Sequence, residues 1–409
     1  MEEINEVNNK AKHGDYKFFI GMLAGVTTMV IIFFAIHLLV PGLLSGGHNA
    51  PLSSRGTPIE RKVNEVLHLL DTVYIGEIER QHLIDNMFRG LVFGVGDPYT
   101  VYMTAEEFEI YRQGTDGSFA GIGVNVAVNM EDNTIEIIAP HEGSPAANAG
   151  LLPRDRIVGV NGYSVNGDML QQAITMIRGV PGTTVTLTIL RGSETFNVDI
   201  VRANVEVQTV VHEMLPDNVG YIRISQFAQV TDEQFFVALN DLKQQDLRGL
   251  IIDLRNNPGG RLDTVLSITN ALVPEGVIMY METKAGPTEY HYADSEYLGV
   301  PLLILINDNS ASASEVLAGA VRDTGVGQLV GTTTFGKGVV QNIFTLSCGT
   351  GVVKVTIARY YTPSGVTIHD VGIEPHFMVE MDSVAIAGLD RAEDVQLQAA
   401  IEIMGGKIR

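Results

Sequence analysis

The first long apolar run of the chain covers residues 18–40 and contains no Asp, Glu, Lys or Arg. As a helix rising 1.5 Å per residue, such a run is long enough to cross a bilayer core of about 30 Å. Three lysines lie within residues 1–17, and no Lys or Arg follows the run until Arg55. Basic residues stay on the cytoplasmic side, so we predict a transmembrane helix with a cytoplasmic N-terminus and an extracytoplasmic remainder at the cell membrane. A cleaved signal peptide is the alternative, although the run is long for one and no A-x-A site follows.

Residues 41–58 contain many Gly, Pro and Ser residues and are typical of a linker. In residues 59–112 the apolar positions recur every three or four residues, which predicts a helical region. From residue 113 to 204 the pattern changes to alternating apolar and polar positions. This alternation predicts a β-rich unit, and one amphipathic stretch near residues 169–177 predicts a helix within it.

The part from residue 205 to 380 alternates between strand and helix patterns. Residues 250–254 and 302–306 are continuous apolar runs bounded by turns, as in strands that are buried on both faces. Helical patterns near residues 264–272 and 312–323 follow them, which indicates an α/β domain. A further helix is expected within the C-terminal segment, residues 381–409.

Composition narrows the functions that these domains serve. A net charge of −21 disfavours nucleic acid as a partner. The single cysteine, Cys348, excludes an internal disulfide and a CxxC metal site. Neither His141-Glu142 nor His212-Glu213 extends to HExxH, so we expect no metal and no cofactor.

Three serines, Ser310, Ser312 and Ser314, lie between a predicted buried strand and a predicted helix. Functional groups in α/β sheets favour the carboxyl ends of strands, and the free N–H groups of a helix N-terminus suit an oxyanion. The alternative is a capping box, because Ser312 and Glu315 fit the S-x-x-E pattern. Chemistry alone does not choose among the three serines.

Lys337 belongs to the segment Gly331–Gly338, which nearly matches the phosphate-binding pattern G-x-x-x-x-G-K-[ST]. That motif opens a helix, whereas residues 339–344 look like a strand, so a nucleotide-binding switch is the weaker interpretation. Burial lowers the pKa of a lysine and makes it a candidate general base. On a strand, Lys337 and Gln341 would share one face.

Two glycine-containing turns are candidate sites for backbone N–H groups to meet a ligand. Gly259 and Gly260 end a turn directly after the first buried strand, where an ordinary tight turn is the alternative. Residues 119–124 open the β-rich unit and could bind the terminal carboxylate of a peptide that adds as a strand.

Taken together, these motifs resemble the C-terminal processing peptidases, also called tail-specific proteases. The resemblance covers nearly the whole chain after the linker and depends on motifs in a fixed order. They are Asp97–Thr100, Gly117–Gly123, Gly143–Ala146 with Val160–Gly162, Asp253–Gly260, Ser310–Glu315, Gly331–Gly338 with Gln341, Tyr361–Gly365 and Gly372–Pro375.

The resemblance implies a serine endopeptidase with a PDZ domain at residues 113–204 and a core at 205–380 related to the crotonase-like fold. It implies Ser312 as nucleophile, Lys337 as base and Gln341 as the residue that orients the base. The backbone of Ala313, Gly259 and Gly260 would form the oxyanion hole. The PDZ residues Gly121, Ile122, Gly123 and Val124 would hold the C-terminal tail of a protein substrate.

Two further hypotheses concern regulation and assembly. Arg178 ends the amphipathic helix of the β-rich unit, and we consider it a sensor that reports tail binding to the catalytic pair. The alternative is a favourable charge at a helix end. The resemblance also implies a homodimer formed through terminal helices, although the sequence itself leaves the oligomeric state open. A catalytically idle PDZ adaptor is the principal alternative function.

Overall fold

The computed structural model describes residues 57–141, 143–284, 286–347, 349, 351–381 and 391–408. The expected cytoplasmic segment 1–17, the expected membrane span 18–40 and nearly all of the expected linker 41–58 lie outside the described residues. Within the described ranges, no helix is both long and apolar enough to cross a bilayer. The chain divides into two units, Met1–Leu83 and Ile84–Arg409.

The first unit contains helix α2 (Pro58–Val73), which begins with a capping box. The N–H of Glu60 donates to the Thr57 hydroxyl at 3.3 Å, and the N–H of Thr57 donates to the Glu60 carboxylate at 2.6 Å. No residue of α2 is buried within the described structure. Its exposed apolar residues are Ile59, Val66, Leu69 and Val73.

The core of the second unit is a six-stranded sheet that is parallel except at its first pair. In spatial order its strands are β10 (Val210–Leu215), β11 (Val219–Ile224), β12 (Gly249–Asp253), β15 (Leu302–Ile306), β16 (Gly327–Gly331) and β19 (Phe377–Met378). Every residue of β12 and β15 is buried, which confirms the two strands that the continuous apolar runs predict.

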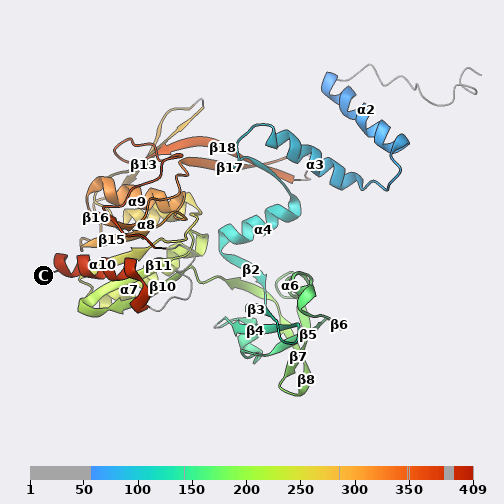
Figure 1. Cartoon of the computed structure of the whole chain (residues 1–409), viewed down its shortest axis with the longest axis horizontal. Coiled ribbons are helices and arrows are strands. Elements are labelled where there is room, and N and C mark those ends of the chain that lie inside the picture. The colour runs from blue at the N-terminus through green and yellow to red at the C-terminus, as the bar shows by residue number, and fades with distance from the viewer. Residues whose placement is uncertain are drawn as a thin grey trace, which may run out of the picture. The chain divides into compact units, whose positions relative to one another are not determined.

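Helices cover both faces of this sheet (Figure 1). One face carries α7 (Gln229–Gln244), α8 (Leu262–Asn270) and α9 (Ala313–Thr324), and the opposite face carries α10 (Val395–Lys407). Side chains alternate along a strand, so Ile252 joins the first apolar cluster while its neighbour Ile251 joins the second. The α/β organisation predicted for this part of the chain is therefore confirmed.

A buried ion-pair network attaches α10 to the centre of the sheet. The Arg255 guanidinium lies 2.7 Å from both the Asp253 and the Asp394 carboxylates, and its side chain is only 1% exposed. Asp394 also caps α10, because its carboxylate accepts the N–H of Leu397. The network joins residues 139 positions apart in the chain and fixes the C-terminal helix next to the turn after β12.

A second sheet packs beside the first and is built around one long strand, β18 (Gly351–Tyr361). Its other strands are β1 (Val101–Thr104), β13 (Gly276–Thr283), β14 (Glu289–Ala293) and β17 (Val339–Thr345). The helical region expected at residues 59–112 contains α2, α3 (Arg80–Phe93) and the start of α4 (Ala105–Asp116), but β1 interrupts it. The short run 101–104 becomes a strand because it pairs with β18, a partner that local periodicity does not reveal.

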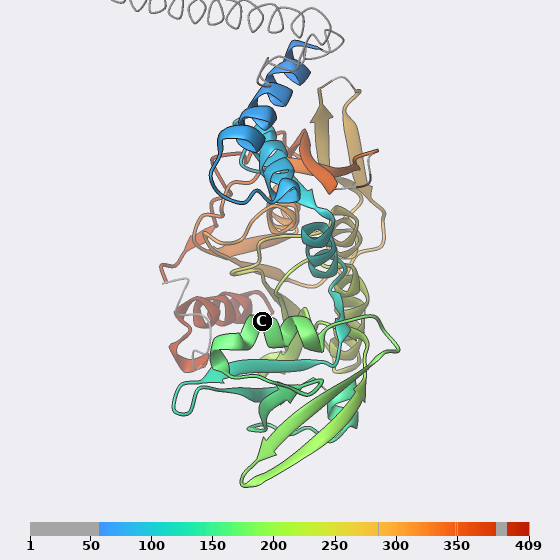
Figure 2. The ribbon, with the colours of Figure 1, turned by 90° about the vertical axis from the view of Figure 1, so that its right-hand side faces the viewer.

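The expected β-rich unit is present, and in the chain it lies between α4 and β10. Its sheet has the order β3-β4-β5-β7-β8, with β6 paired to β5, and the helix α6 (Leu170–Ile177) buries Ala173 and Ile177 against it (Figure 2). The strands are β3 (Val124–Asn129), β4 (Thr134–Pro140), β5 (Arg156–Val160), β6 (Tyr163–Ser164), β7 (Thr184–Arg191) and β8 (Glu194–Val201). The antiparallel pair β2 (Ser118–Gly121) and β9 (Ala203–Glu206) brings the two ends of the unit together.

Candidate active site

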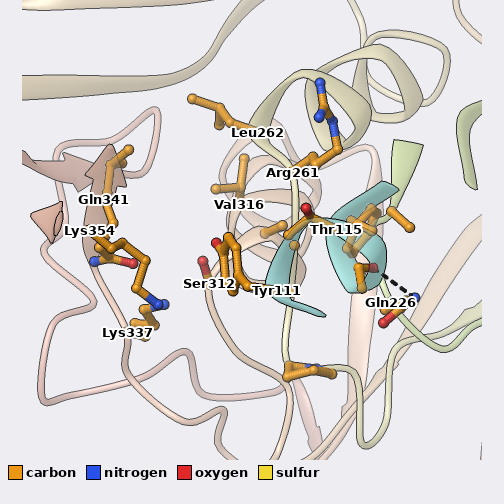
Figure 3. A pocket seen from close by; sticks show the side chains of 18 of the residues that line it. Tyr111, Thr115, Gln226, Arg261, Leu262, Ser312, Val316, Lys337, Gln341 and Lys354 are labelled. Carbon is orange, nitrogen blue, oxygen red and sulfur yellow. Dashed lines mark hydrogen bonds between the residues drawn. The ribbon is translucent and has the colours of Figure 1, made fainter. Parts of the chain in front are cut away.

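A cavity of 570 Å³ brings the predicted site residues of the core together. It is lined by α4, by the turn after β12, by the start of α9 and by strands β17 and β18. Ser312, Ala313, Lys337, Gln341, Gly259 and Gly260 all line it. Figure 3 shows Lys337, Gln341 and Lys354 together on one side of this cavity, with Ser312 and Tyr111 beyond them. Segments that are far apart in the sequence therefore form one concave site.

Ser312 is the residue that immediately precedes α9, and its backbone is strained, with φ 54° and ψ −113°. The two neighbouring serines are buried and structural, because each hydroxyl donates to a backbone carbonyl. Ser310 donates to Leu254 at 2.8 Å, and Ser314 donates to Asn257 at 3.0 Å. Of the three serines that chemistry left open, Ser312 is the one that lines the cavity.

Lys337 lies in the loop before β17 and not on the strand itself, so the shared strand face does not apply, although both Lys337 and Gln341 line the cavity. The strand begins only at Val339, and its pairing with β18 shifts register between Val340 and Gln341. The residues after Lys337 form a strand and no helix, which contradicts the nucleotide-binding interpretation. No cluster of potential metal ligands exists among the described residues.

The surroundings of Lys337 favour its neutral form. Burial lowers the pKa of Lys337 below its ordinary value of 10.5, and the positive charge of Lys354 lowers it further. Glu315 and Asp97 oppose these effects with smaller ones. The ammonium nitrogen lies over the ring of Tyr99, and no hydrogen bond joins it to Ser312 within the described part of the chain.

Gln341 does not contact Lys337 through a hydrogen bond in this arrangement. Its side-chain amide donates to the hydroxyl of Thr356, at 3.4 Å. The N–H of Thr356 in turn donates to the hydroxyl of Thr100 at 3.0 Å, and that hydroxyl donates to Asp97. The segment Asp97–Thr100 is therefore connected to Gln341 through Thr356.

Backbone N–H groups next to Ser312 are available to stabilise an oxyanion. Neither Ala313 nor Gly260 donates its N–H to another described residue. The N–H of Gly259 is already occupied, because it donates to the Asn257 side chain at 2.9 Å. Gly259 instead allows close approach: a Cβ at this position would lie 2.6 Å from the Ala311 carbonyl oxygen, and its φ is +98°.

A second cavity, of 240 Å³, lies in the β-rich unit between the segment 119–126 and helix α6. The predicted tail-binding residues Gly121, Ile122, Gly123 and Val124 line it. Gly123 has φ +75°, and a Cβ there would lie 2.5 Å from the Ser144 Cβ, so the turn requires glycine. An extended peptide can lie along such a groove beside β3.

Arg178 also lines this groove. Its guanidinium lies 5.3 Å from the centroid of the Phe119 ring, within the same unit. Arg178 is the capping residue after α6, and its extended backbone follows the last helical turn. Its described contacts connect the helix end to strand β2 rather than to Lys337.

Sequence patterns alone did not single out Lys354 or assign a role to Tyr99. Lys354 is a lysine within the apolar strand β18, between Val353 and Val355, which is an unusual position for a charge. Its ammonium nitrogen lies 4.9 Å from the centroid of the Tyr111 ring. Tyr99 belongs to the segment Asp97–Thr100, which the sequence marks only as one motif of the family resemblance.

Comparisons with known proteins place these observations in a family context. A model described as peptidase family S41 matches residues 218–379, a PDZ-domain model matches residues 136–191, and a model described as the N-terminal domain of the activating protease CtpB matches residues 48–107.

Curated relatives match over most of the chain. The carboxy-terminal processing protease CtpA of Bacillus subtilis is 36% identical over 327 residues, which cover 79% of this chain and 70% of that protein. The carboxyl-terminal-processing protease of Synechocystis sp. is 38% identical over 319 residues, which cover 76% of this chain and 74% of that protein. A solved photosystem II D1 C-terminal processing protease is 29% identical with a TM-score of 0.46, covering 78% of this chain and 86% of that one.

Proposed function

This chain belongs to the carboxy-terminal processing serine peptidases of family S41, which carry a PDZ domain, and we propose that Ser312 and Lys337 are its catalytic pair. One observation carries this proposal. Ser312 lines the same cavity as a lysine whose pKa is lowered by burial and by a neighbouring lysine. A serine needs an adjacent base to become a nucleophile, and a neutral amine is such a base.

The reaction is acyl transfer to Ser312. Neutral Lys337 takes the hydroxyl proton as the Ser312 oxygen attacks the carbonyl carbon of the scissile peptide bond. The N–H groups of Ala313 and Gly260 stabilise the resulting oxyanion. The protonated amine then gives its proton to the leaving amino group, and water hydrolyses the acyl-enzyme with Lys337 again as base.

The resting arrangement has to change before this step. The Lys337 amine lies over Tyr99, and the Gln341 amide is bound to Thr356. In our proposal, substrate binding moves the amine towards Ser312 and allows Gln341 to orient it. Hydrogen bonds at catalytic sites without substrate are often long or misaligned, so this starting geometry is compatible with the role.

The PDZ domain captures the C-terminal tail of a protein substrate in the groove beside Gly121–Val124, and the core cleaves the tail. Arg178 is placed to sense this event, because its guanidinium lines the groove. A bound tail that displaces Arg178 from Phe119 would signal occupancy to the core. Such coupling requires that the tail bind one arrangement better than the other.

The expected location and assembly are also proposals. Residues 18–40 would anchor the chain in the cell membrane, with the peptidase outside. Protease added to intact cells should then digest the chain after the anchor, and protection of that part would contradict this topology. The exposed apolar residues of α2 favour a homodimer, and a monomer at micromolar concentration by light scattering would contradict it.

The decisive experiment for the catalytic pair compares three proteins with a fluorophosphonate probe and a tailed protein substrate. Wild type should be labelled at Ser312 and should cleave the substrate. Ser312→Ala and Lys337→Ala should do neither while keeping nearly the wild-type melting temperature. Cleavage by Ser312→Ala would overturn the assignment, and wild type without any labelling or cleavage would favour an idle PDZ adaptor.

A further inference from the structure

Glu315 is a carboxylate with 0% exposed surface in the first turn of α9. The sequence marks it only as the partner of Ser312 in a capping box. In the structure its side chain reaches beyond the helix and accepts four hydrogen bonds, one from Ser312 and three from the loop that contains Thr334, Gly336 and Lys337. Burial raises the pKa of Glu315, and the four hydrogen bonds oppose this shift because they stabilise the carboxylate anion.

The two residues of the proposed catalytic pair share one oxygen of this carboxylate. The N–H of Ser312 donates to Oε2 at 2.8 Å, and the N–H of Lys337 donates to the same oxygen at 2.8 Å. The other oxygen, Oε1, accepts the Thr334 hydroxyl at 2.6 Å and the N–H of Gly336 at 2.7 Å. Glu315 thus joins the start of α9 to the loop that carries Lys337.

Tyr360 holds the opposite side of the same two residues. Its hydroxyl, on strand β18, lies 2.9 Å from the carbonyl oxygen of Ser312 and 2.7 Å from that of Lys337. The ring is 3% exposed. The N–H groups of Ser312 and Lys337 therefore both donate to Glu315, and their carbonyl oxygens both lie within hydrogen-bonding distance of the Tyr360 hydroxyl.

Regular secondary structure does not include Lys337, and it holds Ser312 only through its carbonyl oxygen, which accepts the N–H groups of Glu315 and Val316 of α9. Ser312 has a positive φ, which a non-glycine residue keeps only when its surroundings impose it. Lys337 lies before the first residue of β17 and has no strand partner. The relative position of the two residues therefore depends on the side chains that connect their backbones.

We propose that Glu315 and Tyr360 are positioning residues that set the distance and orientation between Ser312 and Lys337 from both sides. This inference rests on the proposed catalytic pair and extends it. We refer to the two side chains as the Glu315–Tyr360 brace. Glu315 lies behind the cavity lining and Tyr360 is part of it, and each acts through the backbone of Ser312 and Lys337.

The brace requires a carboxylate rather than an amide. The two oxygens of an ionised glutamate only accept hydrogen bonds, which matches four converging donors. Glutamine would turn an NH₂ group towards two of those donors and would push them apart. A misplacement of about 1 Å at a catalytic pair can cost about 100-fold in rate.

Glu315 has an electrostatic effect that a purely structural residue would lack. Its negative charge raises the pKa of Lys337, against the opposite influences of burial and Lys354. Removal of this charge should let the pKa of Lys337 fall further. The ascending limb of the pH–rate profile should then move to lower pH even though the maximal rate decreases.

The experiment measures kcat, KM and the pH dependence of peptide cleavage for Glu315→Gln and Tyr360→Phe. For Glu315→Gln we expect kcat about 100-fold lower, KM within about twofold of wild type, and an ascending limb at lower pH. Tyr360→Phe removes only a neutral hydroxyl, so we expect kcat about 10-fold lower with the limb unmoved. Glu60→Gln, in the exposed capping box of α2, is the matched control and should behave as wild type.

Each result has a distinct meaning. If Glu315→Gln keeps the wild-type kcat and the wild-type position of the ascending limb of the pH–rate profile, the brace is wrong. If Glu315→Gln does not fold, a wild-type kcat in Tyr360→Phe contradicts the brace instead. Ser312→Ala is measured alongside. If Ser312→Ala is inactive while both brace variants are normal, only the brace is wrong. If Ser312→Ala still cleaves, the catalytic assignment itself is wrong. The brace is then wrong as well, because it rests on that assignment.

Discussion

The ammonium nitrogen of Lys337 lies 4.8 Å from the centroid of the Tyr99 ring. A cation over an aromatic face is stabilised by about 0.5–1 kcal/mol at partly exposed sites. This contact favours the charged lysine in its present position over the ring, where no hydrogen bond to Ser312 is described. It therefore opposes both the deprotonation and the movement that the proposed reaction needs.

Replacement of the ring should accelerate the first chemical step. For Tyr99→Leu we expect probe labelling of Ser312 at neutral pH to be roughly 2–5-fold faster, the equivalent of the lost contact energy. Tyr99→Phe keeps the aromatic face and is the control, with an expected wild-type rate. Slower labelling of Tyr99→Leu would mean that Tyr99 supports the reactive position of Lys337 instead.

Lys354 should influence the pH dependence through its charge. Because this charge lowers the pKa of Lys337, Lys354→Met should raise that pKa and move the ascending limb of kcat/KM to higher pH. Lys243→Met, an exposed lysine on α7, should leave the profile unchanged. If the ascending limb of kcat/KM does not move in Lys354→Met, the charge of Lys354 does not influence the pKa of Lys337.

Gly259 should be intolerant of a side chain for a steric reason. A Cβ at Gly259 would lie 2.8 Å from the Ala313 nitrogen, which belongs to the proposed oxyanion hole. For Gly259→Ala we expect kcat to fall by about 10²–10³, the usual effect of losing one oxyanion donor, with little change in KM. Gly405→Ala, within α10 and without a neighbour inside 4 Å, is the control and should keep full activity. Normal kcat in Gly259→Ala would show that this turn does not shape the site.

The buried network at α10 should control stability rather than catalysis. For Arg255→Met we expect the free energy of unfolding to drop by about 3–5 kcal/mol, since two buried carboxylates lose their partner. Urea denaturation measures this change. A loss below 1 kcal/mol would show that the carboxylates find other partners.

The same network predicts sensitivity to acid. Burial raises the pKa of Asp394, but its hydrogen bonds with Arg255 outweigh this effect and hold the pKa below the ordinary 3.8. The stability that Asp394 contributes is present above pH 3.8 and is lost as the pH falls through the lower folded value. Asp394→Asn should therefore be less stable than wild type at neutral pH, and the difference should shrink on acidification. A difference that stays constant with pH would exclude this contribution.

Arg178 offers a test of communication from the PDZ groove. A free C-terminal tail peptide should change the cleavage of a short reporter peptide by wild type but not by Arg178→Ala. Phe119→Leu removes the ring under the guanidinium and should have the same effect. Gln172→Ala, exposed on the same helix, is the control. An unaltered response in Arg178→Ala would leave Arg178 as a charge at a helix end.

The sequence was sufficient for the parts of the fold that local patterns encode. The apolar runs at 250–254 and 302–306 predict β12 and β15 because both faces of these strands are buried. Strand β1 was missed because its partner, β18, lies about 250 positions later in the chain. A pattern of four residues does not carry that information.

The candidate active site was also predictable only in part. Motifs mark the serine cluster and Lys337, and the family resemblance, but not chemistry, selects Ser312. The structure adds the reason that Ser310 and Ser314 are unavailable, namely their bonds to backbone carbonyls. Glu315 fits a common capping pattern, so nothing local reveals that it also accepts the N–H of Lys337.

The pairing of β1 with β18 has a consequence for the newly made chain. Thr100 and Thr356 are joined by a hydrogen bond although 256 positions separate them, and the whole PDZ domain lies between. Domains fold as units during synthesis, so the PDZ domain can fold before β18 has been made and can pair with β1. The peptidase core is completed only after the ribosome has made β18 and α10. A chain still under synthesis therefore lacks the assembled site of the proposed catalytic pair, and on that proposal it is unable to cut itself or its neighbours.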